Sequence, residues 1–234
     1  MVEELKLKAL YRDLLGKVSD ETVAQALISG GLDLELGGEI KEVSVLFCDI
    51  RGFTERTEKM HPGDVIEMLN QHMTSMTELV RKHHGVVDKF VGDEIMAVFG
   101  GLKSYGNDAA NAASCALEMI ETRGQQNETA EFPLSVGIGL ATGEVVAGCM
   151  GSVDRLNYTV LGARVNLAAR LCSAAGPMEI VIDKETRGRL ESGAKTGAIS
   201  GLELKGFSTS VEAFRLLADD KRSTPLEGEP VPVS

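Results

Sequence analysis

Apolar residues gather in short runs between residues 42 and 99, and their spacing predicts three strands. Residues 42–48 alternate Val43, Val45 and Phe47 with Ser44, Leu46 and Cys48, which indicates a strand with both faces largely buried. Residues 86–91 and 95–99 form two shorter runs. Between these runs lies Gly92-Asp93-Glu94, a typical hairpin turn, so we expect the two runs to pair with each other.

Elsewhere the apolar spacing changes to three or four residues, which predicts helices. One long helix begins with Pro62 at its first position and ends at Gly85. Asn107 can cap an alanine-rich helix that runs to about Arg123. Two further helices are expected, from Gly162 to about Ala175 and over Lys184–Leu190.

The second half of the chain contains more strands. Leu134–Ala141 and Glu144–Gly148 are expected to be separate strands joined by a turn at Thr142-Gly143. Glu179–Ile182 is a third, and a final hairpin is expected from the two runs Leu202–Lys205 and Val211–Leu216. The order predicts an α+β fold: a ferredoxin-like βαββαβ core with helices on one face of an antiparallel sheet, followed by additional βα units and the hairpin.

Three segments follow from these patterns. Residues 1–38 are expected to be a helical linker, either packed on the core or forming a short coiled-coil stub that joins an upstream regulatory domain or a second subunit. Residues 39–217 contain the predicted strands and helices and form the main domain. Residues 218–234, with three prolines, are expected to be disordered.

Composition narrows the class of protein. The 234 residues suit one sizeable domain with appendages, and no run approaches the roughly 18 apolar residues that a membrane span needs. The four cysteines have no CxxC spacing, so we expect reduced thiols and a cytoplasmic location. A net charge of −11 argues against a nucleic-acid partner. Because the protein is acidic, it could bind an anionic ligand only where bound cations or nearby Lys and Arg side chains offset the charge.

Two aspartates are the first candidates for chemistry. Asp49 follows the strand at 42–48 and precedes Gly52, and Asp93 lies in the hairpin turn. Alone, Asp49 could cap the next helix and Asp93 could stabilise the turn. In a ferredoxin-like sheet, however, the first strand pairs with the third, which would bring the two carboxylates close together. Their repulsion would be relieved by a divalent cation, so the pair favours a metal site.

Other polar residues are ambiguous by themselves. Lys89 lies among apolar residues and is either a solvated strand lysine or a group reaching into a pocket. Asn166 and Arg170 are four residues apart and share a helix face, which could be a surface stripe or a phosphate-binding pair. Thr159 could simply pack within a strand.

Three ordered motifs carry a resemblance to a known family. FCDIRGFT, DKFVGDEIMAVFG and NYTVLGARVNLAAR resemble the two metal motifs and the dimer-partner motif of the class III nucleotidyl cyclases, and the match runs from about Glu42 to Leu216. The resemblance implies a head-to-tail homodimer with two sites at the interface, each using residues of both chains. It also implies two metal ions per site, Mg²⁺ or Mn²⁺, with Ca²⁺ possible at one position.

The resemblance also implies a role for each candidate. Asp49, Ile50 and Asp93 of one chain would hold the metals, and the turn of Gly52, Phe53 and Thr54 would bind phosphates. From the other chain, Lys89 and Thr159 would recognise the purine, Asn166 would orient the ribose and Arg170 would stabilise the reacting phosphate. Lys205 looks like the additional phosphate-binding lysine of the family.

The residues at the base-reading positions favour ATP as substrate. Lys89 is a donor suited to an acceptor nitrogen of adenine, whereas guanylate-specific relatives typically have Glu there. Thr159 marks a subgroup of which many members respond to bicarbonate. The predicted function is an adenylate cyclase that converts ATP to cyclic AMP and pyrophosphate. The alternatives are a guanylate cyclase, a non-catalytic nucleotide-binding module on the same fold, and a diguanylate-cyclase-like domain, for which VGDEI is a poor match to GGDEF.

Overall fold

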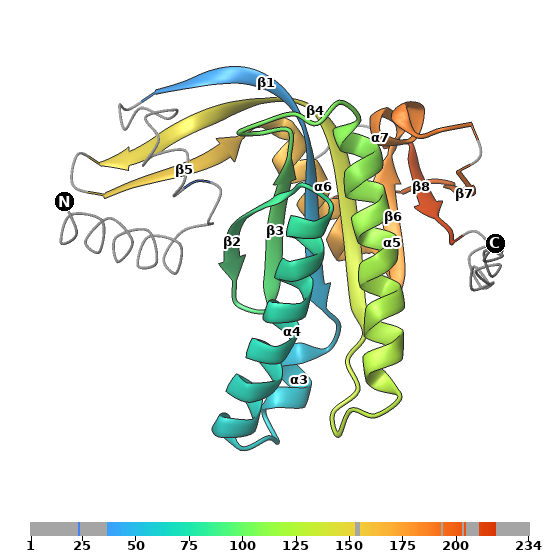
Figure 1. The fold of residues 1–234 in the computed structure, drawn as a ribbon. Coiled ribbons are helices and arrows are strands. Elements are labelled where there is room, and N and C mark those ends of the chain that lie inside the picture. The colour runs from blue at the N-terminus through green and yellow to red at the C-terminus, as the bar shows by residue number, and fades with distance from the viewer. Residues whose placement is uncertain are drawn as a thin grey trace, which may run out of the picture.

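The computed structural model describes residues 23, 37–152, 155–192, 194–202, 204 and 211–218, with backbone only at 155 and 156. They form a mixed α+β fold around one eight-stranded sheet (Figure 1). Its strands follow the order β2-β3-β1-β4-β6-β8-β7, with β5 paired to β4. Almost all of the predicted linker and tail lies outside the described residues.

The first part of the sheet is the predicted ferredoxin-like core. Strand β1 (Gly37–Ile50) lies between β3 (Glu94–Phe99) and β4 (Val136–Ser152) and is antiparallel to both. The hairpin partner of β3 is β2 (Val86–Val91), at the sheet edge. The prediction that the first strand pairs with the third is therefore confirmed.

Helices cover both faces of this sheet (Figure 1). The long helices α4 (Pro62–Lys82) and α5 (Asp108–Asn127) lie side by side on one face, and α6 (Ala163–Ala174) lies on the other. Short helices α3 (Phe53–Thr57) and α7 (Lys184–Arg189) follow β1 and β6 (Glu179–Asp183). Helix α5 extends one turn beyond the predicted end at Arg123.

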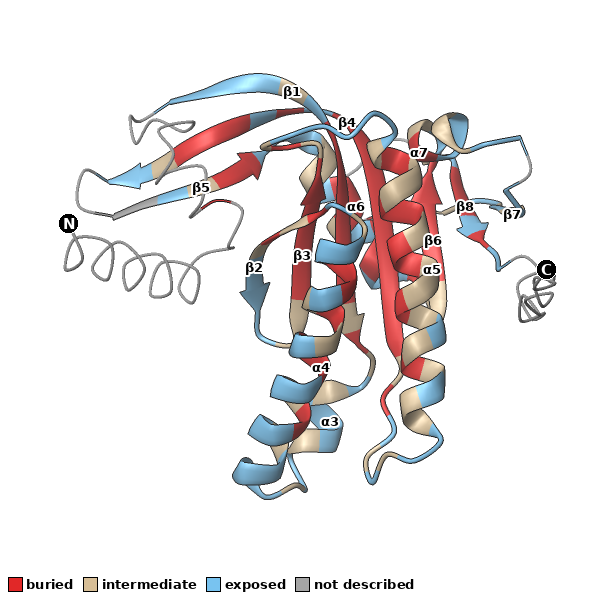
Figure 2. Ribbon diagram, in the orientation of Figure 1, coloured by how far each residue is buried: buried red, intermediate tan, exposed pale blue. Residues whose placement is uncertain are grey.

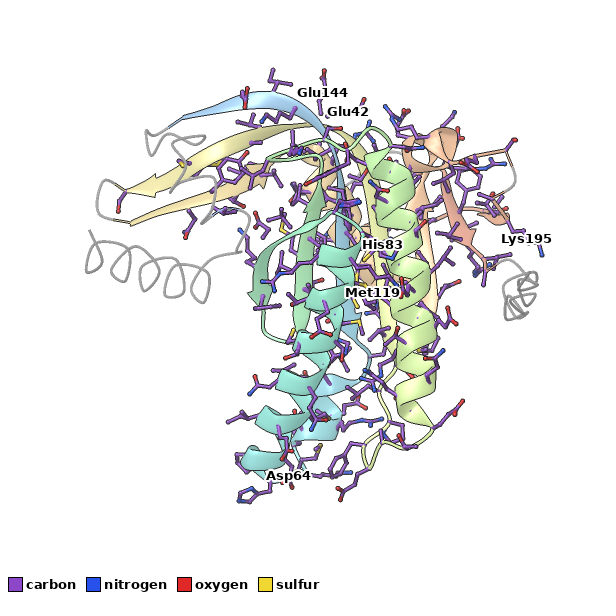
Figure 3. All side chains as sticks on the ribbon, in the orientation of Figure 1. Glu42, Asp64, His83, Met119, Glu144 and Lys195 are labelled. Carbon is purple, nitrogen blue, oxygen red and sulfur yellow. The ribbon has the colours of Figure 1, made fainter. Side chains whose placement is uncertain are left out.

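The core has two halves because residues 43–48 of β1 are buried whichever face they point to, whereas residues 37–40 are exposed (Figure 2). Leu46, Cys48 and Ile50 face the α4–α5 side, where they join residues such as Met76 and Met119. Figure 3 shows Met119 on α5, in front of the sheet. Val43, Val45 and Phe47 face the α6 side, together with Leu167 and Leu171. The strand thus has the two-sided burial that its sequence predicts.

Three strand predictions need correction. Residues 136–152 form one continuous strand rather than two, with Val43 opposite Gly143 and Ser44 opposite Thr142. Arg155–Leu161 forms a strand, β5, that the predicted order omits. The ladder partners of β8 (Ala213–Leu216) are β6 and β7 (Thr196–Ile199), and the predicted order omits β7. Of the expected partner run, residues 203 and 205 lie outside the described residues, and Leu202 accepts a backbone hydrogen bond from Val211. Alanine and glycine in β7 give it little strand signal.

Candidate functional site

The two candidate aspartates meet at one end of the sheet. Asp49 is the second-last residue of β1, and Asp93 lies in the β2–β3 turn beside Gly92, whose φ is 66°. Cys48 is opposite Ile95 in the register, which brings the turn alongside Asp49. Burial raises the pKa of Asp49, and the neighbouring Asp93 raises it further by charge and by a side-chain hydrogen bond.

Asp49 does not act as a helix cap. The residue at the N-cap of α3 is Gly52, with φ 68°, and no side chain caps that helix. The space where a side chain at Gly52 would lie is open. Phe53 packs against the core, whereas Thr54 is exposed. The turn from Gly52 to Thr54 is therefore accessible directly after the Asp49 strand end.

Sequence reasoning missed a third carboxylate at this end of the sheet. Glu94, directly after Asp93, is partly buried. Burial, then Asp49 and Asp93, raise the pKa of Glu94 to about 7, while Arg51 acts in the opposite direction. Its only signal in the sequence is its place beside Asp93 in the turn. The negative charges of Asp49 and Asp93 therefore act on Glu94 as well as on each other.

Arg51 is a further residue that the sequence did not single out. Its Nη1 donates to Asp49 Oδ2 at 2.7 Å, and its Nη2 donates to the backbone carbonyl of Cys172 near the end of α6. Gly137, opposite Asp49 in β4, leaves the space that this guanidinium occupies. Arg51 therefore connects the carboxylate end of β1 to α6.

The donor set suits a hard divalent ion. The described residues include no group of three or more His, Cys, Asp or Glu arranged to hold one metal. Mg²⁺ is commonly bound by only one or two carboxylates together with substrate phosphates and water. Asp49 and Asp93 offer carboxylate oxygens of that kind at the strand end that precedes the open Gly52 turn.

Helix α6 carries the second pair of candidates. Asn166 and Arg170 are both exposed, while Leu167 and Leu171 of the same helix are buried. This arrangement confirms that the two polar residues share the outer face. Within the part of the chain that the structure describes, no hydrogen bond or ion pair engages either side chain. Both groups are thus available to a ligand.

Lys89 and Thr159 come together although they are 70 positions apart in sequence. The link is Asp88, which no sequence argument had identified: Thr159 Oγ1 donates to Asp88 Oδ2 at 2.9 Å, and Lys89 Nζ lies 3.2 Å from the same oxygen. Lys89 is exposed and Thr159 is largely buried. The only sequence signal for Asp88 was an acidic residue within an apolar run.

The position of Lys89 differs from simple strand alternation. The pairing of β2 with β3 shifts between Val87 and Lys89, so Asp88 is the extra residue of a β-bulge. Val87 is buried and Lys89 is exposed, so they do not share the face on which regular strand alternation would place both. Lys205 lies outside the described residues, and its predicted role stays a prediction.

Comparison with known proteins gives the family. The model of the adenylate and guanylate cyclase catalytic domain matches residues 37–218. An uncharacterised protein of Mycobacterium tuberculosis is 37% identical over 198 residues, which are 82% of this chain and 33% of that protein. The chain thus spans about a third of the length of such curated relatives.

Solved structures of both substrate types are similar to this chain. The adenylyl cyclase CyaB from P. aeruginosa is 32% identical with a TM-score of 0.74, and the match covers 80% of this chain and 98% of that one. The guanylyl cyclase Cya2 is 31% identical with a TM-score of 0.73 over the same shares. A bacterial light-regulated adenylyl cyclase, 24% identical, shares the fold with a TM-score of 0.79 over 92% of this chain and 63% of that one. The chain belongs to the adenylate and guanylate cyclase catalytic domain family.

Proposed function

We propose that this chain is an adenylate cyclase, converting ATP to 3′,5′-cyclic AMP and pyrophosphate. The observation that carries the proposal is the convergence of Lys89 and Thr159 on one buried carboxylate. An ammonium donor and a hydroxyl lie side by side there, with no glutamate at the lysine position. That pair complements the acceptor nitrogen and the amino group of adenine.

The working unit in this proposal is a head-to-tail homodimer. Ile40, Val146 and Leu161 are exposed apolar residues in register across β1, β4 and β5. Phe90 and Val91 are exposed on the edge strand β2. Exposed apolar residues gathered on adjacent strands typically mark a protein–protein interface, and a second copy of the chain would cover them.

The chain's own residues would divide the work. Asp49, Asp93 and the Ile50 carbonyl would hold Mg²⁺ or Mn²⁺, two ions per site with Ca²⁺ possible at one, and the ions would polarise the phosphates and lower the pKa of the ribose hydroxyl. The open Gly52–Thr54 turn would receive phosphate oxygens. From the partner chain, Asn166 would orient the ribose, and Arg170 would stabilise charge that develops on the phosphate.

Location and regulation are also part of the proposal. Among the described residues, no helix is both long and apolar enough to cross a bilayer. We place the domain in the cytoplasm, where its nucleotide substrate is found. Because the curated relatives are about three times longer than the match, an upstream regulatory domain would control the dimer. Bicarbonate is a candidate activator.

A product assay tests the function directly. Purified protein is supplied with ATP or GTP at equal concentration, with Mg²⁺ or Mn²⁺, with and without bicarbonate, and the cyclic products are separated by chromatography. We expect cyclic AMP to dominate. A clear preference for GTP would contradict the substrate assignment. Asp49→Ala should abolish turnover while the protein keeps its circular dichroism spectrum, and normal activity of that variant would refute the metal role.

A further inference from the structure

Asp88 occupies an unusual place for an acidic residue. It is the extra residue of the β2 bulge, and only 5% of its side chain is exposed. Three donors surround the carboxylate: the Thr159 hydroxyl at 2.9 Å, the Lys89 ammonium at 3.2 Å, and the backbone N–H of Val160. Burial raises the pKa of Asp88 above its usual value, and the three donors, which favour the ionised form, offset part of that rise.

The carboxylate fixes the direction of the Thr159 hydrogen bonds. A threonine hydroxyl has one proton to donate and two lone pairs that accept. An ionised carboxylate can only accept, so the single proton of Thr159 is used by Asp88. Toward any other ligand, Thr159 can then act only as an acceptor. Thr159 is thereby restricted to one of the two roles that a free hydroxyl has.

The same carboxylate holds the amine of Lys89. An ammonium has three protons and no acceptor site, so it remains a donor after one proton is shared with Asp88. About 45% of the Lys89 side chain is exposed, which leaves the remaining protons available. Lys89 and Thr159 therefore present one donor and one acceptor to a ligand, and neither can change its role while Asp88 is charged.

This arrangement distinguishes the two purines. Adenine offers an amino donor beside an acceptor ring nitrogen, whereas guanine offers a carbonyl acceptor beside a ring N–H. The ring nitrogen of adenine can accept from Lys89, and its amino group can donate to Thr159. Guanine would instead place its ring N–H against the Lys89 donor and its carbonyl against the Thr159 acceptor. Buried polar mismatches of that kind discriminate strongly between similar substrates.

We propose that Asp88 is a positioning residue that sets nucleotide specificity: by accepting from Thr159 and Lys89 it fixes their donor and acceptor roles, and so selects ATP over GTP. The inference rests on the proposed function for the identity of the base-reading pair. It assigns the selectivity to a residue that does not itself contact the base.

The test is the ratio of kcat/KM for ATP to kcat/KM for GTP in Asp88→Asn. The amide can turn its NH₂ toward Thr159, which frees the hydroxyl proton for the guanine carbonyl. We expect the ratio to fall about tenfold, the effect of one neutral hydrogen bond gained or lost. In a Thr159→Val background the same change should have a clearly smaller effect, because the two residues act together.

Asp183→Asn is the matched control. Asp183 is a buried carboxylate, 3% exposed, that accepts from the backbone N–H groups of Thr142 and Thr186 and from Arg164. Its replacement should lower thermal stability and leave the ATP to GTP ratio unchanged. A folded Asp88→Asn protein with the wild-type ratio would overturn the proposal, as would an equal change of ratio in both variants.

Two further variants decide the question if Asp88→Asn does not fold. Thr159→Val removes the acceptor and should lower the ratio, whereas Thr159→Ser keeps the hydroxyl and should preserve it. An unchanged ratio in Thr159→Val would also overturn the proposal. Failure of the proposed function is a separate result: the wild-type protein would then favour GTP, whatever change of ratio Asp88→Asn produces.

Discussion

The approach of α6 to β4 allows a sharp prediction at Gly139. A Cβ atom at this position would lie 2.1 Å from the backbone nitrogen of Cys172 and 2.3 Å from the carbonyl oxygen of Ala168. Both are main-chain atoms of the helix, so a change of rotamer cannot relieve the clash. To reach ordinary contact at 3.4 Å, the helix must move by about 1.3 Å from the strand, the difference between 3.4 and 2.1 Å.

Gly139→Ala should therefore be costly in both stability and activity. Because main-chain atoms cannot move aside, the loss of stability should lie at the upper end of the usual range for overpacking, about 3 kcal/mol. For a domain of this size such a loss lowers Tm by roughly 6–12 °C. Because α6 carries Asn166 and Arg170, a displacement near 1 Å should also reduce kcat/KM by about 10²-fold. Urea titration, thermal melting and the product assay measure the three effects.

Gly197→Ala is the control for this prediction. Gly197 lies in β7 of the same sheet, and a Cβ there would meet nothing within 4 Å. Its replacement should leave activity unchanged and raise the free energy of unfolding by about 0.5 kcal/mol, since alanine restricts the unfolded chain. If Gly139→Ala is as stable and active as Gly197→Ala, the reasoning from close packing is refuted.

Three other measurements test the site and the core. Arg170→Ala should lower kcat by about 10²–10³-fold with a smaller change in KM, since the arginine acts on the transition state, and a change in KM alone would contradict that role. Mixing inactive Asp93→Ala and Arg170→Ala chains should restore activity, because one site of each heterodimer is intact; a verified heterodimer without activity would exclude shared sites. Burial, and secondly the charge of Arg123, lowers the pKa of His72 from 6.5 to about 4. Between these pH values the folded protein therefore binds fewer protons than the unfolded chain does. His72 alone should lower the free energy of unfolding by about 3 kcal/mol as pH drops from 7 to 4, whereas Glu94, with its raised pKa, contributes in the opposite direction. Urea titrations of His72→Leu and wild type should therefore differ by about 3 kcal/mol more at pH 4 than at pH 7, in favour of the variant, and a difference that does not change with pH would exclude this role of His72.

Local sequence patterns predicted those parts of the fold that depend on local chemistry. Pro62 at the first turn of α4 and Asn107 at the cap of α5 are signals within their own elements, and both helices begin as predicted. The pairing of β1 with β3 followed from topology, since few arrangements accommodate a βαββαβ order. The meeting of Asp49 and Asp93 at one end of the sheet was therefore predictable from the sequence.

The errors arose where partners distant in sequence determine the backbone. Thr142-Gly143 has the composition of a turn, but the chain continues through it as a strand. The Thr142 hydroxyl is hydrogen-bonded to the hydroxyls of Ser44 and Thr186, each at 2.8 Å, and the backbone N–H of Thr142 donates to Asp183. These partners are 41 to 98 positions away, so no local window contains the information.

The same reasoning explains why the site was predicted only in part. Lys89 and Thr159 were recognisable through family motifs, but their mutual position depends on a one-residue bulge at Asp88, which inverts the expected alternation of β2. A period of two predicts that Asp88 and Lys89 point to opposite faces, yet the Lys89 ammonium lies 3.2 Å from the carboxylate of Asp88. The bulge is what allows a buried acid and an exposed amine to act together. Substrate selectivity in this chain should accordingly be sensitive to the length of β2: deleting Asp88 restores regular pairing and would remove the contact between β2 and Thr159 along with the carboxylate.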